Sequence, residues 1–93
     1  MLLRFYKDPE TDLPHIYRHG VNKHEVEEVL LRPMEDRIGH EGARIAVGQT
    51  RSGRYLRVIY VPDPEHDALF VITAYELGHK ARRALKRRRK KKP

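Results

Sequence analysis

The residues best suited to chemistry are arginines spaced along a segment expected to form neighbouring β-strands. Four of them lie on or beside these strands: Arg44, Arg51, Arg54 and Arg57. Guanidinium groups stay charged at neutral pH and pair bidentately with phosphate oxygens. If the outward faces of the strands converge, these side chains form a clamp for a phosphodiester. The alternative is that they are solvated residues on the free face of a sheet, where strand alternation places polar side chains.

Two further residue types supply candidates for proton transfer at the end of the last expected strand. Cleavage of RNA without a metal needs a base for the 2′-hydroxyl, an acid for the leaving 5′-oxygen, and cations beside the phosphorus. Tyr75 and His79 are the candidate acid and base, and Arg44 and Arg57 the candidate catalytic cations. This chemistry requires no cofactor.

The histidines suggest a metal site as an alternative. His15 and His19 would share one face of a continuous helix, as zinc ligands do. However, Gly20 interrupts the helix before His24, and no Asp, Glu or Cys falls in the required register. His19 is equally well explained as a helix-terminal residue near the negative helix end. We therefore expect no metal.

The tyrosines offer flat surfaces on which bases stack. For Tyr6, Tyr17 and Tyr60 we favour the alternative of half-buried residues with solvated hydroxyls. The role of Tyr75 is left open by its position at the end of a strand.

Positive charge is concentrated at the C-terminal end of the chain. The 93 residues include 20 Lys and Arg and 13 Asp and Glu, a formal net charge of +7. Residues 80–93 hold ten of the basic residues and no acid, which leaves residues 1–79 with a net charge of −3. Such asymmetry indicates a polyanionic partner, bound with release of counterions, or alternatively a solubilising end with no dedicated partner. The candidate nucleic-acid-binding residues are Arg51, Arg54, Lys80, Arg82, Arg83, Lys86, Arg87, Arg88 and Arg89.

Hydrophobic periodicity divides the chain into helices, then strands, then a basic helix. A short strand is expected over residues 2–6, one or two helical turns between Pro14 and Gly20, and an amphipathic helix that Asn22 and Glu25 cap as a box-like pair. Strands follow around residues 45–47, over 55–61 and over 68–75, and Ala81, Ala84 and Leu85 give the basic helix a small apolar face. This order predicts an α+β protein of two layers, with the helices on one face of an antiparallel sheet of about three or four strands. We expect one domain over residues 1–85 and a disordered polybasic tail over residues 86–93.

Composition narrows the location of the protein. No apolar run approaches the roughly 18 residues of a membrane span, and the charged N-terminus does not resemble a signal peptide. Cysteine is absent, which fits a reducing compartment. We therefore expect a cytoplasmic protein with no membrane partner.

Three segments together resemble the BrnT-type toxins and related domains of unknown function. These proteins belong with the RelE-like bacterial ribonuclease toxins. HGVNKHEVEEVLLRP resembles their His-Gly and amphipathic-helix signature, EGARIAVGQTRSGRYLRVIYV their Glu-and-Arg entry to the sheet and the hairpin after it, and VITAYEL their last strand. The resemblance covers residues 15–85. His19 and Gly20 match the family's His-Gly, and Glu41 and Arg44 match its Glu-and-Arg pair.

The resemblance implies a RelE-like fold, a metal-independent endoribonuclease of a toxin–antitoxin pair, and a small antitoxin protein as partner. Where BrnT-type toxins carry Ser-Ala-Arg, with the Arg needed for toxicity, this chain has Thr73, Ala74 and Tyr75. Other RelE-like enzymes place a Tyr in the site. The alternative function is a non-catalytic nucleic-acid-binding module on the same fold. Substrate sequence, oligomeric state and ribosome dependence do not follow from the sequence.

Overall fold

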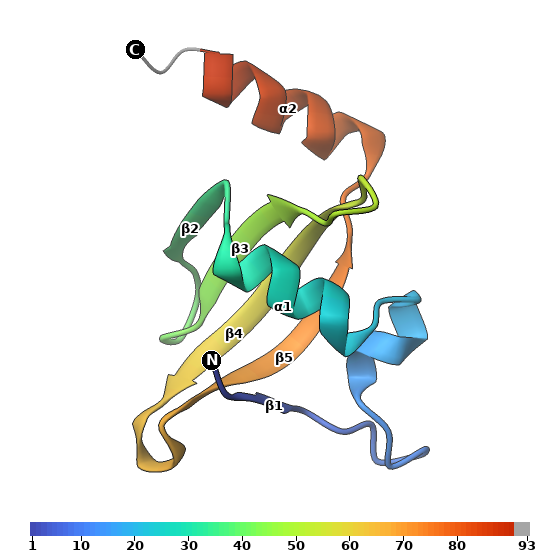
Figure 1. The fold of residues 1–93 in the computed structure, drawn as a ribbon, viewed down its shortest axis with the longest axis vertical. Coiled ribbons are helices and arrows are strands. Elements are labelled where there is room, and N and C mark those ends of the chain that lie inside the picture. Colours follow the sequence, from blue (N-terminus) through green and yellow to red (C-terminus); the bar gives the residue numbers. More distant parts are fainter. Residues whose placement is uncertain (91–93) are drawn as a thin grey trace.

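Five strands form a single mixed sheet in the order β1-β5-β4-β3-β2 (Figure 1). The computed structural model describes residues 1–90, and its strands are β1 (Leu3–Phe5), β2 (Glu35–Ile38), β3 (Arg44–Gln49), β4 (Tyr55–Asp63) and β5 (Ala68–Glu76). Its helices are α1 (Lys23–Leu31), α2 (His79–Lys90) and the short 3₁₀ helices η1 (His15–His19) and η2 (Pro64–His66). The predicted α+β class is confirmed.

The sheet has more strands than the predicted three or four, and it is not wholly antiparallel. β2 pairs with β3 at one edge, but its sequence, EDRI, has one apolar residue and so lacks the alternation that marks a strand. That residue, Ile38, is 76% exposed. At the other edge β1 pairs with β5 in parallel, through Leu3 with Leu69 and Phe5 with Val71. The parallel pairing is possible because the chain passes through α1 and three strands before β5 forms.

α1 begins where the sequence predicts, directly after Asn22. The Asn22 side chain accepts from the Glu25 backbone N–H at 2.9 Å, and the Glu25 carboxylate accepts from the Asn22 N–H at 3.1 Å. This reciprocal pair satisfies two amides that the first turn of a helix leaves free. Val26, Val29 and Leu30 are buried against one face of the sheet, which forms the main core. That face includes Ala46, Leu56, Val58, Tyr60 and Val71.

α2 packs on the opposite face of the sheet, so the prediction that the helices share one face is wrong. Leu85 is fully buried with Val47 and Leu77, and Tyr55 packs against this cluster. Val47 and Tyr55 alternate along their strands with Ala46 and Leu56, and alternating side chains point to opposite faces. The predicted apolar face of α2 is therefore used, but on the side away from α1. Within the described residues, no helix is both long and apolar enough to span a membrane.

The basic helix continues past Leu85, the residue at which we expected the packed domain to end. Residues 86–90, expected in a disordered tail, form the last turns of α2. Arg88 donates to both carboxylate oxygens of Glu35 at 2.8 and 2.9 Å, and Arg89 donates to the Met34 carbonyl at 2.9 Å. Side-chain contacts to β2 and the residue before it thus extend the helix beyond its apolar face. Residues 91–93 of the expected tail lie outside the described residues.

We predict that Leu85→Ala releases α2 from the sheet. Leu85 is the buried anchor of the helix, and truncating a buried Leu costs about 2–5 kcal/mol. Because the cluster beneath α2 is small, we expect the free energy of unfolding in urea to fall by about 2 kcal/mol, the lower end of this range. Amide hydrogen exchange should become faster in α2 alone. Leu31→Ala is the matched control, since Leu31 is 60% exposed. Equal effects of the two substitutions would contradict the packing described.

Candidate functional site

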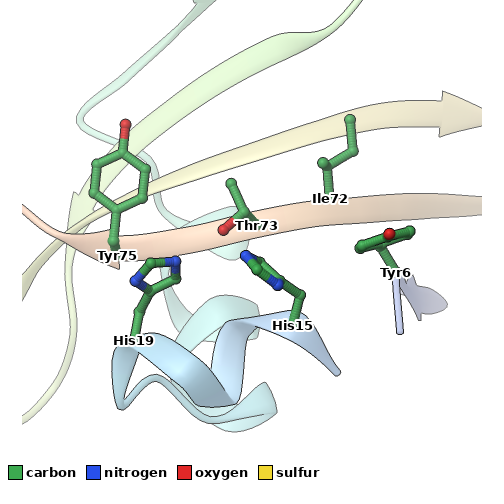
Figure 2. Close-up of a pocket in the computed structure, with 6 residues that line it drawn as sticks. All are labelled: Tyr6, His15, His19, Ile72, Thr73 and Tyr75. Atoms are coloured by element: carbon green, nitrogen blue, oxygen red, sulfur yellow. The ribbon is translucent and has the colours of Figure 1, made fainter. Parts of the chain in front are cut away.

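A pocket opens where β1 leaves the edge of β5. The Tyr6 N–H donates to the Val71 carbonyl at 2.8 Å, and the chain then turns away, so β1 borders only the first half of β5. η1 lies beside the second half (Figure 2). Ile16, 1% exposed, anchors η1 in the main core. Gly20 ends η1 with a left-handed backbone (φ 68°), a conformation that glycine adopts without strain.

This arrangement turns two imidazoles toward β5. The rings of His15 and His19 point from η1 to the strand, with Tyr6 at one end of the row and Tyr75 at the other (Figure 2). Successive ring centroids are 6.1 Å apart from Tyr6 to His15, 5.3 Å from His15 to His19 and 5.9 Å from His19 to Tyr75. The open pocket has a volume of about 560 Å³ and is lined by Tyr6, His15, His19, Ile72, Thr73 and Tyr75.

Arg57 places a positive charge next to this row. It pairs with Tyr75 across β4 and β5, and its Nη1 lies 3.4 Å from the Tyr75 hydroxyl. Its guanidinium carbon is 5.7 Å from the Tyr75 ring centroid. Arg57 Nε and the Thr73 hydroxyl are buried and have no hydrogen-bond partner within residues 1–90. Such unsatisfied buried groups are costly in a protein.

The four arginines do not form the expected clamp. Arg44 pairs with Tyr60 and therefore lies on the α1 face, whereas Arg57 pairs with Val47 and Tyr75 on the other face. Arg44 Nε donates to Asp36 at 3.1 Å, and the Tyr60 hydroxyl donates to the same carboxylate at 2.6 Å. Burial, and then the Asp36 carboxylate, raise the pKa of Tyr60 above its ordinary value. Arg44 is thus engaged on the far side of the sheet from the pocket.

Arg51 and Arg54 have different surroundings from each other. Arg51 is exposed in the hairpin between β3 and β4. The Arg54 guanidinium donates to both carboxylate oxygens of Glu25 at 2.9 and 2.8 Å, to Glu76 at 3.2 Å and to the Gly20 carbonyl at 3.0 Å. The hydrogen bonds to Glu25 raise the pKa of Arg54. Arg54 therefore joins α1, η1 and the end of β5.

His79 does not line the pocket. It is the exposed first residue of α2 and is separated from Tyr75 by Glu76, the last residue of β5, and by Leu77 and Gly78. Among the cations of α2, Arg82 and Lys86 lie over the Tyr55 ring, 4.9 and 5.8 Å from its centroid. Lys80, Arg83 and Arg87 are exposed, and Arg88 and Arg89 make the contacts to Glu35 and Met34 given above.

The structure thus groups two of the four predicted catalytic residues, Arg57 and Tyr75, with His15 and His19, which the sequence interpretation did not count among the catalytic residues. Within residues 1–90, no three His, Asp or Glu side chains are arranged to hold a metal ion. The spacing of His15 and His19 signalled that the two share one face. It did not indicate that this face borders β5, because that contact is long-range.

We predict that Arg54→Ala destabilises the fold, whereas Arg51→Ala does not. Removing the Arg54 guanidinium leaves two carboxylates and a carbonyl without their donor, and hydrogen bonds to charged groups contribute about 1.5–3 kcal/mol. Because the Arg54 side chain is 28% exposed, we expect the free energy of unfolding to fall by an amount near the lower end of that range, as measured in urea. Exposed Arg51 serves as the matched control, with an expected change within about 0.5 kcal/mol. A similar stability for both variants would show that the Arg54 contacts contribute little.

Comparison of the chain with protein-family models, with curated proteins and with solved structures gave no match in any of the three. A function for this protein is therefore proposed mainly from the geometry of the site.

Proposed function

We propose that this protein binds RNA and cleaves it without a metal, as the ribonuclease of a toxin–antitoxin pair. The observation that carries the proposal is the position of Tyr75, which contacts Arg57 of β4 and His19 of η1 and lines one open pocket together with His19. An imidazole, a phenol and a guanidinium can supply the base, the acid and the cation that cleavage through the 2′-hydroxyl requires. The resemblance of three segments to BrnT-type toxins supports the toxin role and a small antitoxin protein as partner.

In the proposed reaction, the RNA phosphate lies against Arg57 and the pocket histidines transfer protons. One histidine takes the proton of the 2′-hydroxyl, whose oxygen attacks phosphorus and forms the new P–O2′ bond. The P–O5′ bond breaks, and the leaving oxygen receives a proton from the second histidine or from Tyr75. The products end in a 2′,3′-cyclic phosphate and a 5′-hydroxyl. Arg57 stabilises the charge that accumulates on the phosphoryl oxygens in the transition state.

α2 supports the RNA-binding part of the proposal. Arg88 contacts Glu35, and Glu35, Val47, Arg57 and Tyr75 occupy successive positions in one row across β2, β3, β4 and β5. Paired residues share a face of the sheet, so α2 lies on the same face as Arg57. The exposed cations of α2 would hold the RNA backbone beside the pocket.

A second candidate is a non-catalytic nucleic-acid-binding module. It is favoured by Lys80, Arg83 and Arg87, which are exposed on α2 and do not line the pocket. In that case the pocket binds a nucleotide without cutting it, and the cations of α2 contribute the affinity.

We predict that Arg57→Ala slows RNA cleavage about 10²–10³-fold, the usual effect of losing one donor to the transition state. His19→Ala should cost about 10²–10⁴-fold, as expected for a proton-transfer group, and Tyr75→Phe should slow cleavage if the hydroxyl donates a proton. Rates are measured on a single-stranded RNA, with circular dichroism as the check on folding. The reaction should persist in a chelator and yield 2′,3′-cyclic ends.

Matched controls are Arg32→Ala, His24→Ala and Tyr17→Phe, which change exposed residues of the same types outside the pocket. Each control should cleave at the wild-type rate. Wild-type protein that binds RNA but leaves it uncut, with and without ribosomes, would support the non-catalytic module. Cleavage that stops in the chelator would instead support a metal at His15 and His19.

We predict a separate effect of the charge on α2. The triple variant R83Q, R87Q and K90Q should bind RNA more weakly, with a shallower dependence of log affinity on log salt by about 0.7 per lost phosphate contact. Substitution leaves the Arg88 and Arg89 contacts in place. The control is K7Q, K23Q and R32Q, which removes three exposed cations outside α2. Equal salt slopes for the two triple variants would show that α2 is not the RNA-binding element.

A further inference from the structure

A buried carboxylate lies behind one of the pocket histidines. Asp8, 5% exposed, sits in the turn between β1 and η1. Its Oδ1 accepts from the Glu10 backbone N–H at 3.0 Å, and its carbonyl accepts from the Asp12 N–H at 2.7 Å. The Glu10 hydrogen bond, and then Arg18, lower the pKa of Asp8. Asp8 is therefore an ionised carboxylate held in a fixed position.

The second oxygen of this carboxylate is turned to η1. Asp8 Oδ2 is ion-paired with Arg18 Nε and lies 3.6 Å from Nδ1 of His15. Arg18 also donates to Glu10, whose side chain is 79% exposed. The imidazole of His15 lines the pocket, so one of its nitrogens has a buried carboxylate neighbour while the ring itself faces the open site.

The two pocket histidines thus differ in their surroundings. The contacts described for His19 are with rings, His15 on one side and Tyr75 on the other. Of the two, only His15 has a described contact with a carboxylate. A carboxylate at one imidazole nitrogen fixes the tautomer and the orientation of the ring and stabilises the imidazolium that forms on proton uptake.

We propose that Asp8 positions His15 as the general base of the site. The carboxylate keeps the proton of neutral His15 on Nδ1, which leaves Nε2 unprotonated and able to accept the proton of the 2′-hydroxyl. His19 and Tyr75 then remain on the side of the leaving 5′-oxygen. The assignment of His15 as base rests on the proposed ribonuclease function, whereas the tautomer that Asp8 imposes does not.

The tautomer is measured first, on the wild-type protein without RNA. Two-bond ¹H–¹⁵N correlation spectra of ¹⁵N-labelled protein, taken above the titration of the histidines, distinguish the Nδ1–H from the Nε2–H form. We expect His15 to be the Nδ1–H form. An Nε2–H form at His15 overturns the proposal, whether or not the protein cuts RNA. Uncut RNA together with an Nδ1–H His15 overturns the ribonuclease function and leaves the positioning by Asp8 in place.

The second experiment compares Asp8→Asn with Glu10→Gln. Both substitutions remove a carboxylate that pairs with Arg18, but only Asp8 contacts His15. We expect Asp8→Asn to lower kcat about 10²-fold with KM little changed, because the base is misoriented while RNA contacts persist. It should also shift His15 toward the Nε2–H form, and Glu10→Gln should change neither.

The His15 tautomer of the wild-type protein does not depend on whether the Asp8→Asn variant folds. Asp8→Asn sets an amide N–H₂ against either the Glu10 N–H or Arg18, so this variant is expected to lose some stability. If it does not fold, the wild-type tautomer still decides the question. A folded Asp8→Asn with wild-type kcat, or with an unchanged His15 tautomer, overturns the positioning role.

Discussion

The candidate site depends on the guanidinium of Arg54. This group joins the Gly20 carbonyl at the end of η1, Glu25 in the first turn of α1 and Glu76 at the end of β5. Glu25 also closes the capping box of α1, so one carboxylate serves both the helix start and the Arg54 cluster. Gly20 follows His19 and Glu76 follows Tyr75, so Arg54 bonds to the neighbours of both rings. An ion-pair cluster outside the pocket thus joins the two elements that carry His19 and Tyr75.

The acidic body of the chain uses its carboxylates to engage its own arginines. Asp36 pairs with Arg44, Asp63 with Arg4, and Glu25 and Glu76 with Arg54. A more exposed pair such as Arg4–Asp63 contributes little stability. Their consequence is electrostatic, since these arginines are neutralised by carboxylates. Arg37 of β2, Arg57 of β4 and the exposed cations of α2 lie on the α2 face, where the proposed polyanion would bind. A sheet with a buried α1 face and a partly open α2 face thus separates the main core from the proposed binding surface.

The distribution of roles among the basic residues could not be read from strand alternation. Arg44 and Arg57 are 13 positions apart, and which face each occupies depends on the strand register and on the hairpin between them. The register puts Arg44 beside Tyr60 and Arg57 beside Tyr75, on opposite faces. η1 adds two histidines to the site through a contact with β5, far away in sequence, because β1 leaves the second half of that strand uncovered.

Local signals in the sequence determined the elements themselves. Asn22 and Glu25 predicted the start of α1, apolar alternation predicted β3, and apolar, β-rich runs predicted β4 and β5. Ala81, Ala84 and Leu85 predicted the packed turn of α2. Each of these signals depends on residues that are close together in the sequence. Only the tertiary structure decided that polar EDRI is an edge strand, that β1 pairs in parallel, and that α2 lies opposite α1 and extends past Leu85. It also brought His15 and His19 to Tyr75, since such contacts depend on how the layers pack rather than on any local preference of the chain.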